Sequence, residues 1–363
     1  MPDISGSLRV YANGANLIAV GFPGYDSEPK PAITKLRRPG AFYILQQLPG
    51  GCSANCAYCN QSRSSQTNTG EKAELCNYEW PLVDLGALLQ HIRSLGKRSD
   101  TLAFCIQTIF HKDSFENQVA ITRKIREVFP ELWITTATTP RTREELAALK
   151  GAGVNSVCLC FEAATFELFD RIKGHGVHGP YRWAQHHQAL KDALELFPDA
   201  TMTHLMIGLG ETELEAFEFI ASMLEMGARV SLFPYLPIAG TPFADDLPKG
   251  AGRPPKPKWR RLQLARYLLA DVGLARHKVQ LSDERIIGFD MPYDEFRRHL
   301  PIAFLHSGCK FCRRAGYAED QDLFSPDYDL TIEPYVFLVP QVPKVIEKII
   351  REMDLQAPSP SHQ

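Results

Sequence analysis

Three cysteines near the start of the chain, Cys52, Cys56 and Cys59, have the spacing C-x₃-C-x₂-C. A short loop with this spacing can bind three corners of a cubane iron–sulfur cluster and leave one iron without a protein ligand. That open iron could bind the amino and carboxylate groups of S-adenosylmethionine (SAM) and pass an electron into its sulfonium. Structural zinc sites are four-coordinate and usually combine two C-x₂-C pairs, so this spacing favours the iron–sulfur cluster over zinc.

The same motif resembles that of the radical SAM superfamily, in which an aromatic residue commonly precedes the third cysteine, as Tyr58 does here. The resemblance implies a 4Fe–4S cluster on the three cysteines and SAM as the second cofactor. It also implies an external electron donor and a 5′-deoxyadenosyl radical that removes hydrogen from an unactivated carbon. The cofactors supply this chemistry, and the protein orients and shields them.

Composition narrows the class of protein. The 363 residues are 44% hydrophobic and 23% charged, with a formal net charge of −2, which is ordinary for a soluble globular protein. This charge gives no reason to expect nucleic acid or an anionic membrane as a partner. No apolar run is long enough to span a membrane, and Met1–Asn16 lacks the layout of a secretion signal. The nine cysteines lie mostly in local groups, which favours metal binding in a reducing compartment, and we expect a cytoplasmic protein.

Apolar segments and helical patterns alternate after residue 40. The expected strands are 42–48, 101–108, 132–137, 155–161, 201–207 and 229–236. Helices are expected at 83–95, 117–128, 142–151, 181–197 and 212–227, and capping-box patterns begin the last helix and the helix at 142–151. Six β–α repeats predict an α/β fold with parallel strands. We expect an open (β/α)₆ partial TIM barrel of the radical SAM type, with the cysteine loop at the C-terminal ends of its strands.

The chain is expected to divide into five parts. Residues 1–40, rich in Gly, Pro and charge, are expected to be a loose N-terminal lead-in, and 41–245 to be the partial barrel. Residues 246–257 are proline-rich and suggest a linker. Residues 258–350 form a C-terminal extension that bears cysteines and begins with a helix at 259–272, and 351–363 are expected to be a frayed tail.

The strand at 201–207 runs into a glycine-rich turn, Gly208-Leu209-Gly210-Glu211-Thr212. Taken alone, this is a tight turn that starts a helix. It resembles the segment that contacts the adenine of SAM in biotin synthase-like radical SAM enzymes, which implies that Ile207, Gly208, Gly210 and Glu211 bind the cofactor. In the same family an acidic residue at the place of Glu162 binds the ribose diol, although a solvated carboxylate at a strand end is the alternative.

A second cysteine pair, Cys309 and Cys312, follows Gly308 with C-x₂-C spacing. Such a pair is a common half-site for zinc or an iron–sulfur cluster. We expect a second, auxiliary cluster, which Cys105 or Cys160 could complete, with zinc or free thiols as the alternatives. Strand alternation places Cys158 and Cys160 on one face, where a packing role is the more common one. Five histidines receive no role: His175, His178, His186, His187 and His204.

The resemblance to biotin synthase itself is incomplete. Arg285 matches its unusual arginine ligand, but the stretches 135–139 and 201–203, which match two of its auxiliary-cluster positions, contain no cysteine. Several blocks instead resemble the biotin synthase-like lipoyl synthases in which two related proteins act together: 162–165, 169–171, 179–183 and 307–312. The run Arg313–Tyr317 departs from that group's pattern.

The lipoyl synthase resemblance implies sulfur insertion into an octanoyl chain on a lysine of a lipoyl-domain or acyl-carrier protein. A sister radical SAM protein would be a partner. The alternatives among enzymes are a biotin synthase-like reaction and a carbon-skeleton rearrangement. The alternative outside enzymes is a zinc-binding scaffold.

Overall fold

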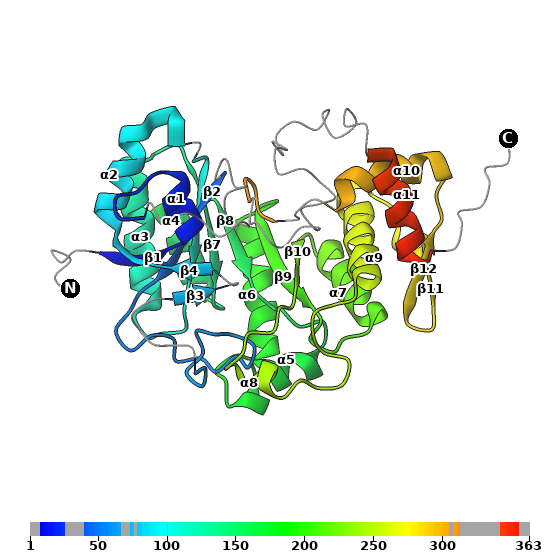
Figure 1. The fold of residues 1–363 in the computed structure, drawn as a ribbon. Helices are drawn as coiled ribbons and strands as arrows, with labels where there is room; N and C mark the ends of the chain where they lie inside the picture. Colours follow the sequence, from blue (N-terminus) through cyan, green and yellow to red (C-terminus); the bar gives the residue numbers. More distant parts are fainter. Residues whose placement is uncertain are drawn as a thin grey trace.

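The computed structural model describes residues 8–25, 40–66, 73–75, 78–99, 101–304, 308–312 and 342–355. Its centre is an eight-stranded sheet with the strand order β10-β9-β8-β7-β6-β2-β1-β5 (Figure 1). Six of these strands run parallel: β2 (Ala41–Gln46), β6 (Ala103–Gln107), β7 (Trp133–Thr138), β8 (Ser156–Leu159), β9 (Thr201–Ile207) and β10 (Arg229–Pro234). They are the six strands that the sequence predicts. The α/β fold built from six β–α repeats is therefore confirmed.

Five helices cover the outer face of the sheet: α2 (Leu85–Leu95), α3 (Ser114–Val128), α4 (Arg143–Ala152), α6 (Trp183–Leu196) and α7 (Glu213–Glu225). A sixth, α5 (Phe166–Ile172), follows β8 and packs its buried residues against the cysteine loop instead. Both capping boxes are present, Thr142 with Glu145 and Thr212 with Glu215. The largest apolar core lies between this layer and the sheet, because alternate strand residues such as Phe104 turn toward the helices. The residues between them, such as Cys105, face the inner side of the sheet.

Part of the region expected to be a loose lead-in is ordered. Strand β1 (Arg9–Ala12) pairs antiparallel with β2 and also with β5 (Leu82–Asp84), and helix α1 (Gly14–Ala19) follows it. For residues 8–25 the expectation was wrong, because long-range pairing with β2 and β5 stabilises a strand that is too short to stand out in the sequence. A small hairpin, β3 (Ala73–Leu75) and β4 (Tyr78–Trp80), precedes β5.

The C-terminal elements gather beyond β10 and α7 (Figure 1). They are α9 (Lys256–Tyr267), the helical turns Leu268–Val272 and Arg276–Lys278, the hairpin β11 (Val279–Ser282) and β12 (Arg285–Phe289), α10 (Tyr293–Ala303) and α11 (Val342–Met353). A buried ion pair between Arg261 of α9 and Glu213 fixes this layer to α7. In the part of the chain that the structure describes, no helix is long and apolar enough to cross a membrane.

The segment between β10 and α9, which includes the proline-rich residues 246–257 expected to be a linker, contacts the rest of the fold. It contains a short helix, α8 (Pro242–Asp245), whose Phe243 is buried and donates its backbone N–H to the Ala57 carbonyl at 3.0 Å. Further along, the Gly252 N–H donates to the Gly208 carbonyl at 2.8 Å. The segment therefore packs against the cysteine loop and the glycine-rich turn. The other expected domain boundaries stay predictions.

Candidate active site

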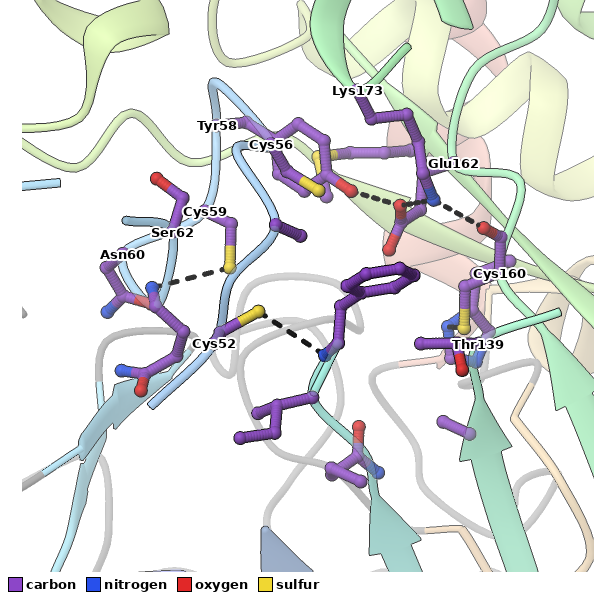
Figure 2. Close-up of a pocket in the computed structure, with 18 of the residues that line it drawn as sticks. Cys52, Cys56, Tyr58, Cys59, Asn60, Ser62, Thr139, Cys160, Glu162 and Lys173 are labelled. Atoms are coloured by element: carbon purple, nitrogen blue, oxygen red, sulfur yellow. Dashed lines mark hydrogen bonds and ion pairs between the residues drawn. The ribbon is translucent and has the colours of Figure 1, made fainter. Parts of the chain in front are cut away.

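The loop that carries Cys52, Cys56 and Cys59 leaves the C-terminal end of β2, as the fold predicts. Backbone hydrogen bonds fasten it to two neighbouring segments: the Ser53 N–H donates to the Phe110 carbonyl at 2.9 Å, and the Ala57 N–H donates to the Ile172 carbonyl at 2.8 Å. All three cysteines line a cavity of about 230 Å³ at this end of the sheet. The structure therefore brings the three thiols of the motif to one cavity wall (Figure 2).

The surroundings of these thiols suit an iron–sulfur cluster. Burial raises the pKa of Cys52 and Cys59 above the usual value and raises the pKa of Cys56 to about 12. Thiolates at these positions therefore need a strongly cationic partner, which cluster irons provide. Two backbone N–H groups point at the sulfurs: Phe110 N lies 3.4 Å from Cys52 Sγ, and Gln61 N lies 3.4 Å from Cys59 Sγ. Such hydrogen bonds stabilise the thiolates that bind a cluster, so the three cysteines and their surroundings fit a 4Fe–4S cluster.

Glu162 faces the cavity from just beyond the end of β8, where its φ of +69° is unusual for a non-glycine residue. The Tyr58 hydroxyl and the Lys173 ammonium both donate to its carboxylate, the latter at 2.7 Å (Figure 2). Burial and then the charge of Glu162 hold the pKa of Tyr58 well above its usual value, so this hydroxyl stays a donor. The arrangement holds a carboxylate at the cavity wall, and ribose binding by Glu162, which the family resemblance implies, stays a prediction.

Lys173 lines the cavity and was missed by the sequence analysis. Its side chain is only 4% exposed; besides Glu162 its ammonium donates to the Cys160 carbonyl at 2.7 Å and lies 4.6 Å from the centre of the Tyr181 ring. Its place depends on α5, a short helix that the apolar periodicity does not reveal. No local motif marks this lysine, because only tertiary contacts set it apart from surface lysines.

The glycine-rich turn lies beside the cavity but does not line it. Gly208 and Gly210 both have φ of +111°, and the Glu211 carboxylate accepts the N–H groups of Gly208 and Leu209 at 2.8 and 2.9 Å. Ile207 is fully buried in the core on the helix side of the sheet, whereas its neighbour Met206 lines the cavity. Adenine binding by Ile207, Gly208, Gly210 and Glu211 stays a prediction, and Glu211 has a structural task here: it holds the turn.

The second cysteine group also comes together. The Cys309 thiol contacts the thiols of Cys105 and Cys312, so the C-x₂-C pair meets the cysteine of β6. The Tyr43 hydroxyl lies 3.2 Å from Cys312 Sγ, and Gln107 Nε2 donates to Cys105 Sγ at 3.0 Å. The juxtaposition agrees with the predicted grouping of these cysteines. Their role as cluster ligands stays a prediction.

Cys160, the other candidate, lies in a different set of contacts. Its sulfur is 3.8 Å from Cys158 Sγ and 3.3 Å from Nδ1 of His204, a histidine to which the sequence assigned no role. His186, by contrast, is a satisfied core residue: Nδ1 lies 3.1 Å from the Arg182 carbonyl among buried aromatic rings.

The match of Arg285 to a cluster ligand is wrong for this chain. The structure places Arg285 on β12, where its guanidinium donates to the carboxylate of Asp354 at 2.6 Å and to the Asp354 carbonyl at 2.6 Å. It is not among the residues that line the cavity. The arginine instead joins the C-terminal hairpin to the end of α11.

Comparison with known proteins gives a consistent family. Residues 47–223 match the family described as the Radical SAM superfamily. The chain is 28% identical to the biotin synthase of Wolinella succinogenes over 185 residues, which cover 50% of this chain and 60% of that protein. It is 26% identical to the biotin synthase of Burkholderia vietnamiensis over 248 residues, 66% of this chain and 67% of that protein. The matched part thus spans about three fifths to two thirds of these relatives.

Among solved structures, similar chains include methylornithine synthase (TM-score 0.47, 13% identity, 79% of this chain and 95% of that one). Another is the FeFe-hydrogenase maturase HydG of Carboxydothermus hydrogenoformans (TM-score 0.46, 16% identity, 70% of this chain and 59% of that one). These likenesses are too distant to say anything of a substrate. The cysteine loop on an α/β sheet agrees with the matches in sequence: residues 47–223 match the radical SAM superfamily, and the chain resembles biotin synthases.

Proposed function

We propose that this protein removes hydrogen from an unactivated carbon of its substrate and then forms a carbon–sulfur bond, with the sulfur taken from a second iron–sulfur cluster. The observation that supports sulfur insertion is the second thiol group, Cys105, Cys309 and Cys312, on the same side of the sheet as the first. Cys52 of the first group and Cys312 of the second pack against one set of buried apolar residues. A sulfur donor beside the radical-generating cavity is what sulfur insertion requires.

The cofactors would supply the bond-breaking chemistry: with an electron from a donor, a 4Fe–4S cluster and SAM yield methionine and a 5′-deoxyadenosyl radical that takes a hydrogen atom from the substrate. Cys52, Cys56 and Cys59 would hold this cluster. Tyr58 and Lys173 fix the Glu162 carboxylate in a position to accept hydrogen bonds from a ribose diol. The cysteine loop and three residues after β10, namely Tyr235, Leu236 and Ile238, line the cavity, and these walls would limit access of water to a reactive radical.

The second thiol group would hold the sulfur source. Cys105, Cys309 and Cys312 would hold this cluster, which would supply the sulfur atom for the new carbon–sulfur bond and take up the electron left over when the substrate radical forms that bond. The Tyr43 hydroxyl near Cys312 and the Gln107 amide near Cys105 offer hydrogen bonds to thiolates, which tune such clusters. This arrangement supports an auxiliary cluster over a simple packing role.

The substrate part of the proposal rests on the resemblance to lipoyl synthases of the two-protein type. By this resemblance, the substrate would be an octanoyl chain on a lysine of a lipoyl-domain or acyl-carrier protein. The partners would be a sister radical SAM protein and an external electron donor. The run Arg313–Tyr317, which departs from that group, lies outside the described residues.

The experiment is an anaerobic reaction of the reconstituted protein with SAM, a reductant and octanoyl-lysyl peptides, with and without a sister protein, followed by mass spectrometry. We expect 5′-deoxyadenosine and a peptide that has gained sulfur. In the variant Cys309→Ser/Cys312→Ser, SAM cleavage should continue while the sulfur product disappears. SAM cleavage with no sulfur transfer to any octanoyl-lysyl peptide would refute the proposed reaction.

Biotin synthase-like chemistry is the second candidate, because both curated relatives described above are biotin synthases. Against it, the stretches 135–139 and 201–203, which match two auxiliary-cluster positions of biotin synthase and lie on or just after β7 and on β9, contain no cysteine. The same reaction with a biotin precursor, or a screen for rearranged carbon skeletons, separates these alternatives. Metal analysis distinguishes the enzyme from a zinc-binding scaffold, because a scaffold would contain zinc and no acid-labile sulfide.

A further inference from the structure

Two cysteines and a histidine converge on the inner face of the sheet, apart from the three-cysteine loop. Cys158 lies on β8, Cys160 directly after it, and His204 on the neighbouring strand β9. Their ligand atoms all lie within 4.8 Å of one another, with 3.8 Å between the two sulfurs and 3.3 Å between Cys160 Sγ and His204 Nδ1. Three such donors at this spacing are a metal-binding set, which neither the family match nor the proposed function uses.

The spacing suits a single ion. For a tetrahedral ion with metal–sulfur bonds of about 2.3 Å, two thiolates lie about 3.8 Å apart. A thiolate and an imidazole nitrogen at about 2.0–2.1 Å from the ion lie about 3.6 Å apart. Two of the three separations agree with these values to within a few tenths of an ångström, and the third, between Cys158 Sγ and the His204 ring nitrogen, is within 4.8 Å. Thiolates on different irons of a cubane stand much farther apart, so these donors are arranged for one ion.

The strand register explains why the three donors meet. Cys158 stands opposite Met202 in the β8–β9 ladder, and beyond it the Glu162 N–H donates to the His204 carbonyl at 2.8 Å. This pairing brings His204 beside Cys160. The Lys173 ammonium holds the Cys160 carbonyl from the other side, and Phe233 packs against the His204 ring at 4.6 Å between ring centres. The donors are thus held by secondary structure rather than by a flexible loop.

We propose that Cys158, Cys160 and His204 form a mononuclear site for a tetrahedral divalent ion. Zinc is the ion that a donor set of two thiolates and one imidazole suits best. Cys158 is buried, whereas Cys160 and His204 line the cavity, so the fourth position of the ion faces the cavity. A position open toward a substrate cavity is typical of zinc that binds water or a substrate atom rather than zinc that only braces a fold.

This site is distinct from the proposed auxiliary cluster, whose cysteines are Cys105, Cys309 and Cys312. Cys309 and Cys160 both pack against the small buried cluster that contains Cys158, so the two sites are neighbours. Their ligands can be removed separately. The inference therefore stands or falls independently of sulfur insertion.

The test measures zinc, iron and acid-labile sulfide in anaerobically purified full-length protein, and then follows cobalt(II) uptake by its thiolate-to-cobalt absorption band. We expect one equivalent of zinc or cobalt in the wild type. The variants Cys158→Ser/Cys160→Ser and His204→Ala should lose that equivalent and keep their iron and sulfide. Retained iron and sulfide show that these variants still fold. His204→Cys, which replaces the imidazole by a thiolate, should keep the ion.

The matched control is Cys309→Ser/Cys312→Ser, which should keep the zinc or cobalt equivalent and the iron and sulfide of the first cluster, while losing the iron and sulfide of the auxiliary cluster. Unchanged zinc in Cys158→Ser/Cys160→Ser would overturn the site, and so would a loss of iron and sulfide in that variant, which would make both cysteines cluster ligands. Wild-type protein that takes up no cobalt, with Cys160 alkylated rapidly by iodoacetamide, would also overturn it. That result would show a reactive thiol–imidazole pair instead.

Discussion

Replacing Lys173 by methionine removes the cation from a buried pair and leaves the Glu162 carboxylate at the cavity wall. The ammonium and carboxylate lie 2.7 Å apart, with side chains 4% and 19% exposed. At this separation the attraction is about 6 kcal/mol for an effective dielectric constant of about 20. Loss of one partner of a buried pair usually costs about 3–5 kcal/mol. Because Glu162 is partly exposed and keeps the Tyr58 hydrogen bond, we expect Lys173→Met to lower the free energy of unfolding by about 3 kcal/mol.

The assay is anaerobic urea unfolding of variants with equal iron content. Lys173→Met/Glu162→Gln should recover at least half of the loss, since no buried charge is then left unpaired. The control is Lys124→Met on α3, whose pair with Glu127 is exposed (47% and 63%). Lys124→Met should lower the free energy of unfolding by less than about 0.5 kcal/mol. The reasoning fails if Lys173→Met costs no more than Lys124→Met, or if the double variant is as unstable as the single one.

Two further changes test the turn and the core. Gly208→Ala should destabilise the protein by at least about 2 kcal/mol in urea unfolding, because its φ is +111° and an added Cβ would lie 2.1 Å from the Gly252 carbonyl oxygen. Gly250→Ala, with positive φ but no atom within 4 Å, is the control, and equal losses would contradict the steric argument. Burial holds the pKa of His186 well below 6.5. The unfolded chain therefore takes up a proton below pH 6.5 while the folded chain does not, and stability should fall by up to about 1.4 kcal/mol per pH unit as the pH decreases from there. His186→Gln should flatten the dependence of the free energy of unfolding on pH, whereas His277→Gln, at an exposed histidine, should not. The same slope in the wild type and both variants would refute the role of His186.

The sequence predicts the parallel sheet well, because each buried strand is a short apolar run between turn residues. The observed strands β6 and β9 begin and end within two residues of the expected ranges. Strand β1 was missed because its stability comes from pairing with β2 and β5 rather than from its own four residues. Helix α5 was missed because seven residues show too little periodicity.

The cysteine loop could be predicted because its ligands are local, so spacing alone carries the signal. Glu162 could be picked out by its match to an acidic residue of the biotin synthase-like family, but its partner Lys173 could not. The convergence of Cys160 with His204 depends on the register between β8 and β9, and no single segment encodes that register. A site whose residues come from different strands therefore cannot be predicted from the sequence alone and becomes visible only in the structure.

The most direct test of the radical SAM centre is Mössbauer and EPR spectroscopy of anaerobic protein labelled with enriched iron, with and without SAM. A 4Fe–4S cluster held by Cys52, Cys56 and Cys59 should contain one iron distinct from the other three, and SAM should change the signal of that iron alone. A cluster with four protein ligands that does not respond to SAM, or protein without iron, would contradict the account.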